Sequence, residues 1–249
     1  MTEEKRLAAI VTGATSGIGL AISQALIESG YQVFGIGRDF TQPDFQEWYK
    51  KVPENSFRSI ELDLAKTDVL APIMKYIQAQ ADVRLLVNNA GCAYYGLHEE
   101  VSPAKISEMV RVNLEVPMIL TQLLLRKFKQ NKGCIVNISS VTASSVNPHG
   151  CAYGATKAGL TSFSRSLFEE ARKYGVRVVT ISPDMTDTRL YRNADFETDA
   201  DREAYLDPQD VANAVLFALQ QPDHVNVGEL TLRPQKHRIA RKNRKFSDP

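Results

Sequence analysis

The sequence has little of what marks secreted, membrane-spanning or nucleic-acid-binding proteins. Its 249 residues include 3 cysteines, and Cys92, Cys134 and Cys151 are scattered singly, without the spacing of metal ligands or a disulfide framework. No apolar run approaches the roughly 20 residues of a membrane span, and the apolar stretch near the N-terminus is too short for a signal peptide. The net charge of +1 points to neither nucleic acid nor an anionic membrane. We therefore expect a cytoplasmic protein with no metal site and with neither of those partners.

What remains is the composition of an ordinary globular chain, with 43% hydrophobic and 24% charged residues. A chain of this length can bury a substantial core. No linker or shift in composition precedes residue 235, so we expect a single domain over residues 1–249. Residues 235–249 are basic and polar. They are predicted to form a solvated, partly flexible tail, with docking to a partner or phosphate as the alternative.

Short apolar runs rich in β-formers alternate with longer helical patterns along the chain. The expected strands are 7–13, 31–37, 57–64, 83–91, 133–140, 176–183 and 228–234. The expected helices are 19–30, 68–80, 102–130, 151–174 and 207–221. This alternation predicts an α/β, Rossmann-like, doubly wound fold: a mainly parallel seven-stranded sheet flanked by helices on both faces.

The first expected strand runs directly into a glycine-rich turn, "TGATSGIG" at residues 12–19. Gly13, Gly17 and Gly19 stand where that strand passes into the first helix. Glycine lets the backbone approach a phosphate closely, and the helix N-terminus offers free N–H groups to it. The spacing G-x-x-x-G-x-G differs from the more common G-x-G-x-x-G, and a plain tight turn would look similar. The position after the first strand favours nucleotide binding.

The end of the second expected strand selects between the two nicotinamide cofactors. An acidic residue there binds the adenosine ribose of NAD(H), whereas an arginine accommodates the 2′-phosphate of NADP(H). Gly37 occupies the place of the acid, and Arg38 follows it. A guanidinium matches the geometry of a phosphate, although Asp39 would repel that phosphate if it turned inward. We expect Arg38 to contact the phosphate, with NADP(H) favoured and NAD(H) possible.

The segment "CAYGATKAGL" (151–160) places Tyr153 and Lys157 one helical turn apart. No other of the 9 tyrosines has a lysine four residues further on. A free tyrosine has a pKa of about 10, too high for an effective base near neutrality. A neighbouring cation favours the phenolate and lowers that pKa. The pair is therefore a candidate for proton transfer, and a solvated pair on a helix surface is the alternative.

With this pair the sequence resembles the short-chain dehydrogenase/reductase family over residues 7 to about 234. The resemblance rests on the order and spacing of several short motifs. They are "TGATSGIG", Asp63 in "LDL", "NNAG" (88–91), Asn113 in "VNL", Ser140 in "NISS", "YGATK" (153–157) and "ISPDMTDT" (181–188). The resemblance implies a dimer or tetramer formed through the segments 118–128 and 160–171.

The resemblance also implies a role for each matched residue. Tyr153 would exchange the proton with the substrate oxygen, and Lys157 would hold the nicotinamide ribose and lower the tyrosine pKa. Ser140, rather than its neighbour Ser139, would orient the substrate oxygen, and Asn113 would support a proton-relay water. The implied cofactor contacts are Gly13, Thr15, Ser16, Gly17, Ile18, Gly19, Arg38, Asp63, Leu64, Asn89, Tyr153, Lys157, Pro183, Thr186 and Thr188.

The sequence departs from the family in one loop and leaves the substrate open. Pro183-Asp184 replaces the usual Pro-Gly, so the contacts of residues 184–186 stay open. The polar segment 189–206 is expected to form a flap over the substrate, opposite a wall formed by residues 92–102. Its candidate substrate contacts are Arg189, Tyr191 and Arg192. The two arginines among them would either attract an anionic substrate or simply be surface charges.

Cys92 and Cys151 flank the expected site. One hypothesis is that they make activity sensitive to thiol oxidants, and the alternative is that they are small buried residues.

Together these patterns predict an NADP(H)-dependent oxidoreductase that transfers a hydride between the nicotinamide and a small carbonyl or secondary alcohol substrate. Tyr153 is its expected general acid/base. The alternative is a nucleotide-binding sensor or interaction protein on the same fold, because a fold does not prove an activity. Such a protein would have lost part of the catalytic set, whereas here Asn113, Ser140, Tyr153 and Lys157 are all present.

Overall fold

The computed structural model describes residues 7–242 and contains one seven-stranded sheet in the order β3-β2-β1-β4-β5-β6-β8. Every neighbouring pair in it is parallel. The strands are β1 (Ala8–Thr12), β2 (Gln32–Gly37), β3 (Phe57–Glu61), β4 (Val83–Asn88), β5 (Cys134–Ile138), β6 (Arg177–Pro183) and β8 (Glu229–Leu232). The strand order reverses between β1 and β4, as in a doubly wound sheet. The predicted fold class is confirmed.

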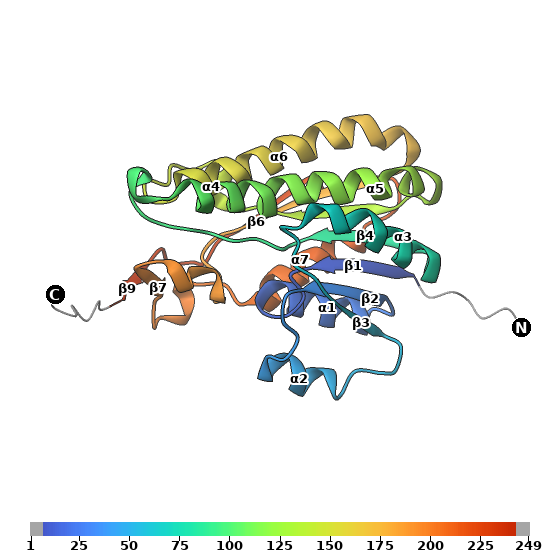
Figure 1. Ribbon diagram of the computed structural model, residues 1–249, viewed down its shortest axis with the longest axis horizontal. Helices are drawn as coiled ribbons and strands as arrows, with labels where there is room; N and C mark the ends of the chain where they lie inside the picture. The colour runs from blue at the N-terminus through green and yellow to red at the C-terminus, as the bar shows by residue number, and fades with distance from the viewer. Residues whose placement is uncertain (1–6, 243–249) are drawn as a thin grey trace, which may run out of the picture.

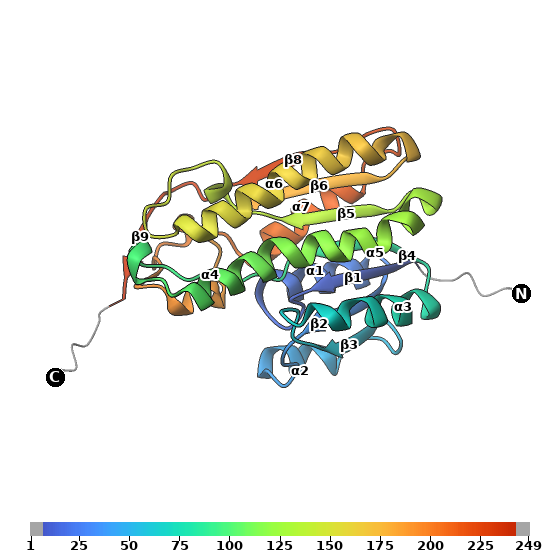
Figure 2. The same cartoon turned by 45° about the horizontal axis from the view of Figure 1, so that its top comes forward.

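Helices cover both faces of the sheet (Figures 1 and 2). One face carries α3 (Leu70–Gln80), α4 (Pro103–Val110), α5 (Val116–Asn131) and α6 (Cys151–Ala171), and the other carries α1 (Gly17–Glu28) and α7 (Pro208–Leu219). Successive side chains of β1 enter opposite apolar layers, Ile10 under α3 and α5 and Val11 under α1 and α7. Within residues 7–242, no helix combines the length and apolar character that a membrane crossing requires.

The helix expected over residues 102–130 is interrupted by a π-helical turn at Arg111–Glu115. Pro117 explains the interruption, because a proline has no N–H to donate to the carbonyl four residues earlier, that of Asn113. Such π-turns occur frequently at functional sites. The start of the helix is as expected, since the Ser102 side chain accepts a hydrogen bond from the Lys105 N–H.

A short helix that the sequence pattern did not predict, α2 (Pro43–Tyr49), follows β2. Its apolar residues Phe45 and Trp48 pack edge-on or tilted against Phe57 at centroid distances of 5.5 and 5.3 Å. With 7 residues it is too short for a periodic pattern to stand out. It is held by packing rather than by helix propensity.

The flap is held by the segment that follows the main sheet. Strand β7 (Phe196–Thr198) pairs antiparallel with β9 (Ile239–Arg241), at the left of Figure 1. Lys242 donates from Nζ to the carbonyls of Tyr191 (2.7 Å) and Ala194 (3.2 Å), and Lys236 pairs with Asp201 at 2.9 Å. Residues 235–242 are therefore bonded to the flap through Lys236 and Lys242, and most of these residues are exposed. The rest of the expected tail lies outside the described residues.

Candidate active site

A cavity of about 490 Å³ opens at the carboxyl ends of the strands, where the strand order reverses. This volume lies within the roughly 300–1,000 Å³ of ordinary ligand sites, and ligands of open α/β sheets bind at this reversal. Most of the predicted site residues line it: Gly13, Thr15, Ser16, Gly17, Ile18, Arg38, Asp63, Leu64, Asn89, Ser140, Tyr153, Lys157, Pro183, Thr186 and Thr188. Two predicted residues, Gly19 and Asn113, lie behind this lining.

The glycine-rich turn forms one end of the cavity. Gly13 and Gly17 have φ values of +69° and +53°, which favour glycine. Gly19 permits close packing, because a Cβ there would lie 2.1 Å from the Gly13 carbonyl oxygen. The Asn89 side chain, which follows β4, donates to the Thr12 carbonyl at 2.9 Å. The turn is thus held against the end of β4, and the N-terminus of α1 faces the cavity.

Both Arg38 and Asp39, which follow β2, line this end of the cavity. A Cβ at Gly37 would lie 2.3 Å from the Thr15 methyl group, so an acidic side chain at position 37 has no room. Arg38 is exposed, and its guanidinium forms no hydrogen bond or ion pair with any described residue. Asp39 instead accepts hydrogen bonds from Thr41 and Gln42. The Thr41 hydrogen bonds lower the pKa of Asp39 most, so the carboxylate is satisfied in its own turn.

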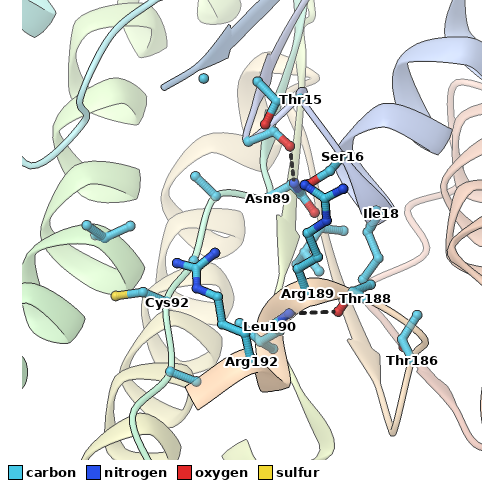
Figure 3. Close-up of a pocket in the computed structure, with 18 of the residues that line it drawn as sticks. Thr15, Ser16, Ile18, Asn89, Cys92, Thr186, Thr188, Arg189, Leu190 and Arg192 are labelled. Carbon is cyan, nitrogen blue, oxygen red and sulfur yellow. Dashed lines mark hydrogen bonds between the residues drawn. The ribbon is translucent and has the colours of Figure 1, made fainter. Parts of the chain in front are cut away.

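Arg189 of the flap reaches across this end of the cavity. Figure 3 shows its side chain extending past Asn89 toward Ser16. Its guanidinium donates to the Gln42 side chain and lies 4.0 Å from Asp44, at the start of α2. Arg189 was expected to be a substrate contact or a surface charge, but the structure places it beside the glycine-rich turn (Figure 3). Its two partners lie at the start of the unpredicted helix α2, Gln42 as the N-cap and Asp44 in the first turn.

Ser140 and Tyr153 form the opposite end of the cavity, which we call the floor. Ser140 follows β5, and Tyr153 lies in the first turn of α6. Tyr153 is 4% exposed, and this burial raises its pKa. A hydrogen bond from Ser140 acts in the opposite direction. Ser139 points elsewhere, with its hydroxyl hydrogen bonded to the Lys157 carbonyl and to Thr161. Of the two adjacent serines, only Ser140 therefore faces the tyrosine.

Lys157 lies one turn along α6, with its ammonium 5.8 Å from the Tyr153 ring centroid. The ammonium donates to the Ile138 carbonyl at 2.8 Å, which leaves two N–H groups for the cavity. Burial lowers the pKa of Lys157 to about 8. In the protein alone the pKa of Tyr153 is raised rather than lowered. The expected depression is absent because desolvation of the phenolate, with Tyr191 nearby, raises the pKa more than the Ser140 hydrogen bond lowers it.

Asn113 supports the floor from behind, inside the π-helical turn. Its side-chain oxygen accepts from the Cys92 N–H, and its amide donates to the Cys92 carbonyl, both at 2.9 Å. The amide also donates to the Thr156 hydroxyl at 3.1 Å. These bonds fix the segment after β4 against α6. The carbonyl of Asn113 is the one that Pro117 leaves without its α-helical donor.

An aromatic cluster packs between the floor and the flap, and two of its members, Tyr153 and Tyr191, line the cavity. Tyr95 lies 6.0 Å from Tyr153, 6.3 Å from Tyr191 and 4.9 Å from Phe196, measured between ring centroids. Glu108, which the sequence analysis did not predict, also lines the cavity and accepts from the Tyr94 hydroxyl at 2.7 Å. Glu108 and Val112 both line the cavity and are four residues apart, which places them on one face of the interrupted helix. This spacing is the feature of the sequence that could have identified Glu108.

The two cysteines near the site differ in exposure. Cys92 is half-buried in the cavity lining, and burial raises its pKa to about 11, so its thiol is a poor nucleophile at neutral pH. Cys151 is exposed, which corrects the interpretation of it as a small buried residue.

Asp184, the departure from the family pattern, accepts from the Met185 N–H at 2.8 Å. Its carboxylate is thus engaged in its own loop. The backbone of residues 184–186 is bonded outward, since the Asp184 N–H donates to the Leu232 carbonyl, the Met185 carbonyl accepts from the Leu206 N–H, and Thr186 bridges to Leu206.

A glycine-rich turn at the N-terminus of α1 thus lies at one end of the cavity, and the buried residues Ser140, Tyr153 and Lys157 lie at the other. A family model for short chain dehydrogenases matches residues 7–198. An uncharacterized oxidoreductase of Staphylococcus saprophyticus is 34% identical over 94% of this chain and 100% of its own length. The chain therefore belongs to the short-chain dehydrogenase family and is an oxidoreductase of that family.

Two solved structures show the same fold over nearly the whole chain. An alcohol dehydrogenase from Thermococcus sibiricus, complexed with 5-hydroxy-NADP, has a TM-score of 0.83 and 28% identity, covering 93% of this chain and 98% of its own. Serine dehydrogenase from Escherichia coli has a TM-score of 0.78 and 28% identity, covering 92% and 98%.

Proposed function

We propose that the protein is an NADP(H)-dependent reductase or dehydrogenase that interconverts a small carbonyl compound and its secondary alcohol, with Tyr153 as general acid/base. One observation carries this proposal. The cavity that begins at the glycine-rich turn and Arg38 ends at Ser140, Tyr153 and Lys157. The alcohol dehydrogenase with bound 5-hydroxy-NADP and the serine dehydrogenase, both similar to this chain, support the reaction class.

The residues present fit such a cofactor. The backbone that Gly13 and Gly17 leave uncovered would hold the pyrophosphate at the N-terminus of α1. Arg38, free of protein partners, would bind the 2′-phosphate, and Arg189 could reach it from the flap. The expected contacts of Asp63 and Leu64 with the adenine lie on the same side of the cavity. Preference for NADP(H) follows from this cation and from the lack of room for an acid at position 37.

The bound nicotinamide would supply or accept the hydride. The protein would supply the proton and the position. Tyr153 stays protonated near neutrality because burial raises its pKa, and this is the form that donates to a carbonyl oxygen. Ser140 would donate to the same oxygen as negative charge develops there. Lys157 would hold ribose hydroxyls with its remaining N–H groups, and the carbonyl of Asn113 would hold a water that returns protons to the floor.

The experiment is a panel of ketones, aldehydes and acyl thioesters, followed through NADPH absorbance and repeated with NADH. We expect at least one class of ketone or aldehyde to be reduced, with NADPH preferred. Absence of turnover with all of them in both directions, while NADPH still binds, would favour a sensor and contradict the proposal.

Pairing of two chains through α5 and α6 stays a proposal. It is supported by a shallow, partly apolar depression between these helices that includes Met118, Phe163 and Tyr174. Light scattering at several protein concentrations tests it, and a monomer at every concentration would contradict it.

A further inference from the structure

Arg192, at the end of the flap's short helical turn Arg189–Asn193, has no assigned partner. It lines the cavity, is exposed, and forms no hydrogen bond or ion pair with any described residue. Figure 3 shows its guanidinium directed toward Cys92, whereas Arg189 extends to the other side toward Ser16. Arg189 and Arg192 therefore lie at different ends of the cavity, and Arg192 lies at the end that contains the floor (Figure 3).

The charges around Arg192 leave it without a protein anion. Glu108, which lines the same end, is hydrogen bonded to the Tyr94 hydroxyl and forms no ion pair with Arg192. Asp184 accepts from its own loop. The other nearby lining, Ala93, Leu190 and Tyr191, is apolar or aromatic. A guanidinium beside apolar walls attracts a planar anion that can bind both arms of its fork.

The flap backbone holds Arg192 in place. The bridge between Thr186 and Leu206 closes the base of the flap, and Lys242 binds the carbonyls of Tyr191 and Ala194, which lie one residue before and two residues after Arg192. These contacts hold the backbone that carries Arg192 at the mouth of the cavity, as the support of a binding group requires.

We propose that Arg192 binds the carboxylate of the substrate, so that the protein acts on small oxo acids and hydroxy acids. This inference rests on the proposed function. The cavity of about 490 Å³ must also hold the dinucleotide, which leaves little room for the substrate and favours a short acid over a long acyl chain. The apolar lining of Ala93, Leu190 and Tyr191 would hold the carbon chain between the carboxylate and the carbonyl that faces Tyr153.

The test compares each acid with its neutral methyl ester. Reduction of 2-oxobutanoate and 3-oxobutanoate and of their methyl esters is measured for wild type, Arg192→Gln and Arg192→Lys. Arg172→Gln is the control, because Arg172 is exposed at the far end of α6, where it pairs with Glu169 and lies over the Phe168 ring, away from the cavity. We expect wild type to prefer at least one acid to its ester. Arg192→Gln should lose about 100-fold in kcat/KM for that acid, mostly through KM, as for a lost charge-assisted contact. Rates with the ester should change less than about threefold, and Arg192→Lys should recover part of the loss.

Equal losses for acid and ester in Arg192→Gln, or no loss for either, would overturn the proposal. Reduction of neutral ketones but of neither acid would also overturn it, while leaving the proposed function intact. A binding measurement keeps the two separate. Calorimetric titration of 2-oxobutanoate and 3-oxobutanoate into the NADP⁺-saturated protein should show binding of at least one acid that Arg192→Gln abolishes. Absence of such binding overturns the proposal even if no carbonyl is turned over.

Discussion

The floor and the flap of the cavity are built in opposite ways. The floor residues Tyr153 and Lys157 are each 4% exposed, and Asn113 behind them is fully buried. Lys157 and Ser139 donate hydrogen bonds to main-chain carbonyls of β5 and α6, and Asn113 accepts one from the main-chain N–H of Cys92, after β4. The flap is exposed and is held by ion pairs and a two-stranded pairing with β9. Under the proposed function, the floor would carry out the chemistry and the flap would select the substrate.

The sharpest way to break this division is Tyr153→Phe. Removing the proton donor should lower kcat by about 1,000-fold, which is within the range of general acid catalysis. Ser140 would still donate a hydrogen bond to the substrate oxygen but would not transfer a proton to it. Affinity for NADPH, measured by its fluorescence, should change less than about threefold, since the ring stays in place. Tyr76→Phe, at an exposed tyrosine on α3 away from the cavity, is the matched control. Normal turnover by Tyr153→Phe would remove it from the proposed role.

Lys157→Met tests the floor through both activity and stability. Activity should fall by about 100-fold as ribose contacts and the local cation are lost. Burial lowers the pKa of Lys157 to about 8, below the ~10.4 of an unfolded lysine. Between these values the unfolded state binds more protons, so stability rises with pH. Wild type should gain about 2 kcal/mol in free energy of unfolding from pH 8 to pH 10 relative to the variant.

Urea denaturation of the protein without cofactor at pH 7, 8, 9 and 10 measures this difference. Comparison with Lys157→Met cancels the other titrating groups, including Tyr153, which both proteins retain. If the free energies of unfolding of the two proteins changed in parallel with pH, burial would not lower the pKa of Lys157.

Arg38→Asp tests the cofactor end, where an exposed cation is presented by a rigid strand. The ratio of kcat/KM with NADPH to that with NADH should fall by about 100-fold, because a phosphate contact is replaced by repulsion. Arg172→Asp is the control for the change in charge. An unchanged ratio would remove Arg38 from cofactor selection and leave Arg189 as the remaining candidate cation.

The smallest effect is expected from loosening the flap. Lys242→Gln loses the contacts with the carbonyls of Tyr191 and Ala194. KM for the substrate should rise about fivefold with little change in kcat, and global stability should change by less than about 1 kcal/mol. Hydrogen exchange should speed up in residues 189–206 only. Lys51→Gln, which removes an exposed ion pair with Glu47 on α2, is the control. A fall in kcat as large as the rise in KM would mean that the flap also shapes the floor.

The same division explains what the sequence could predict. The position of Tyr153 relative to Lys157 follows from helical geometry, and the glycine-rich turn follows from its place after a buried strand. Both are local patterns, so the elements that carry the floor were predictable. Pro117 is the sequence signal for the interruption at Asn113. The helical pattern continues on both sides of this proline, and it therefore predicts one helix over residues 102–130.

The flap depended on long-range contacts instead. Strand β7 has 3 residues and pairs with β9 some forty residues later, so no local pattern marks either strand. The contact of Arg189 with Gln42 joins residues 147 positions apart. The direction in which Arg189 points was therefore not available from the sequence, and neither was the docking of residues 235–242.

A crystal structure of the protein with NADP⁺ tests the central claim most directly. We predict the nicotinamide ring against the Tyr153 hydroxyl, the ribose hydroxyls within hydrogen-bond distance of the Lys157 ammonium, and the 2′-phosphate on Arg38. A dinucleotide whose nicotinamide lies away from Tyr153, with the ammonium of Lys157 still bound only to the Ile138 carbonyl, would contradict the assignment of the floor as the reacting centre.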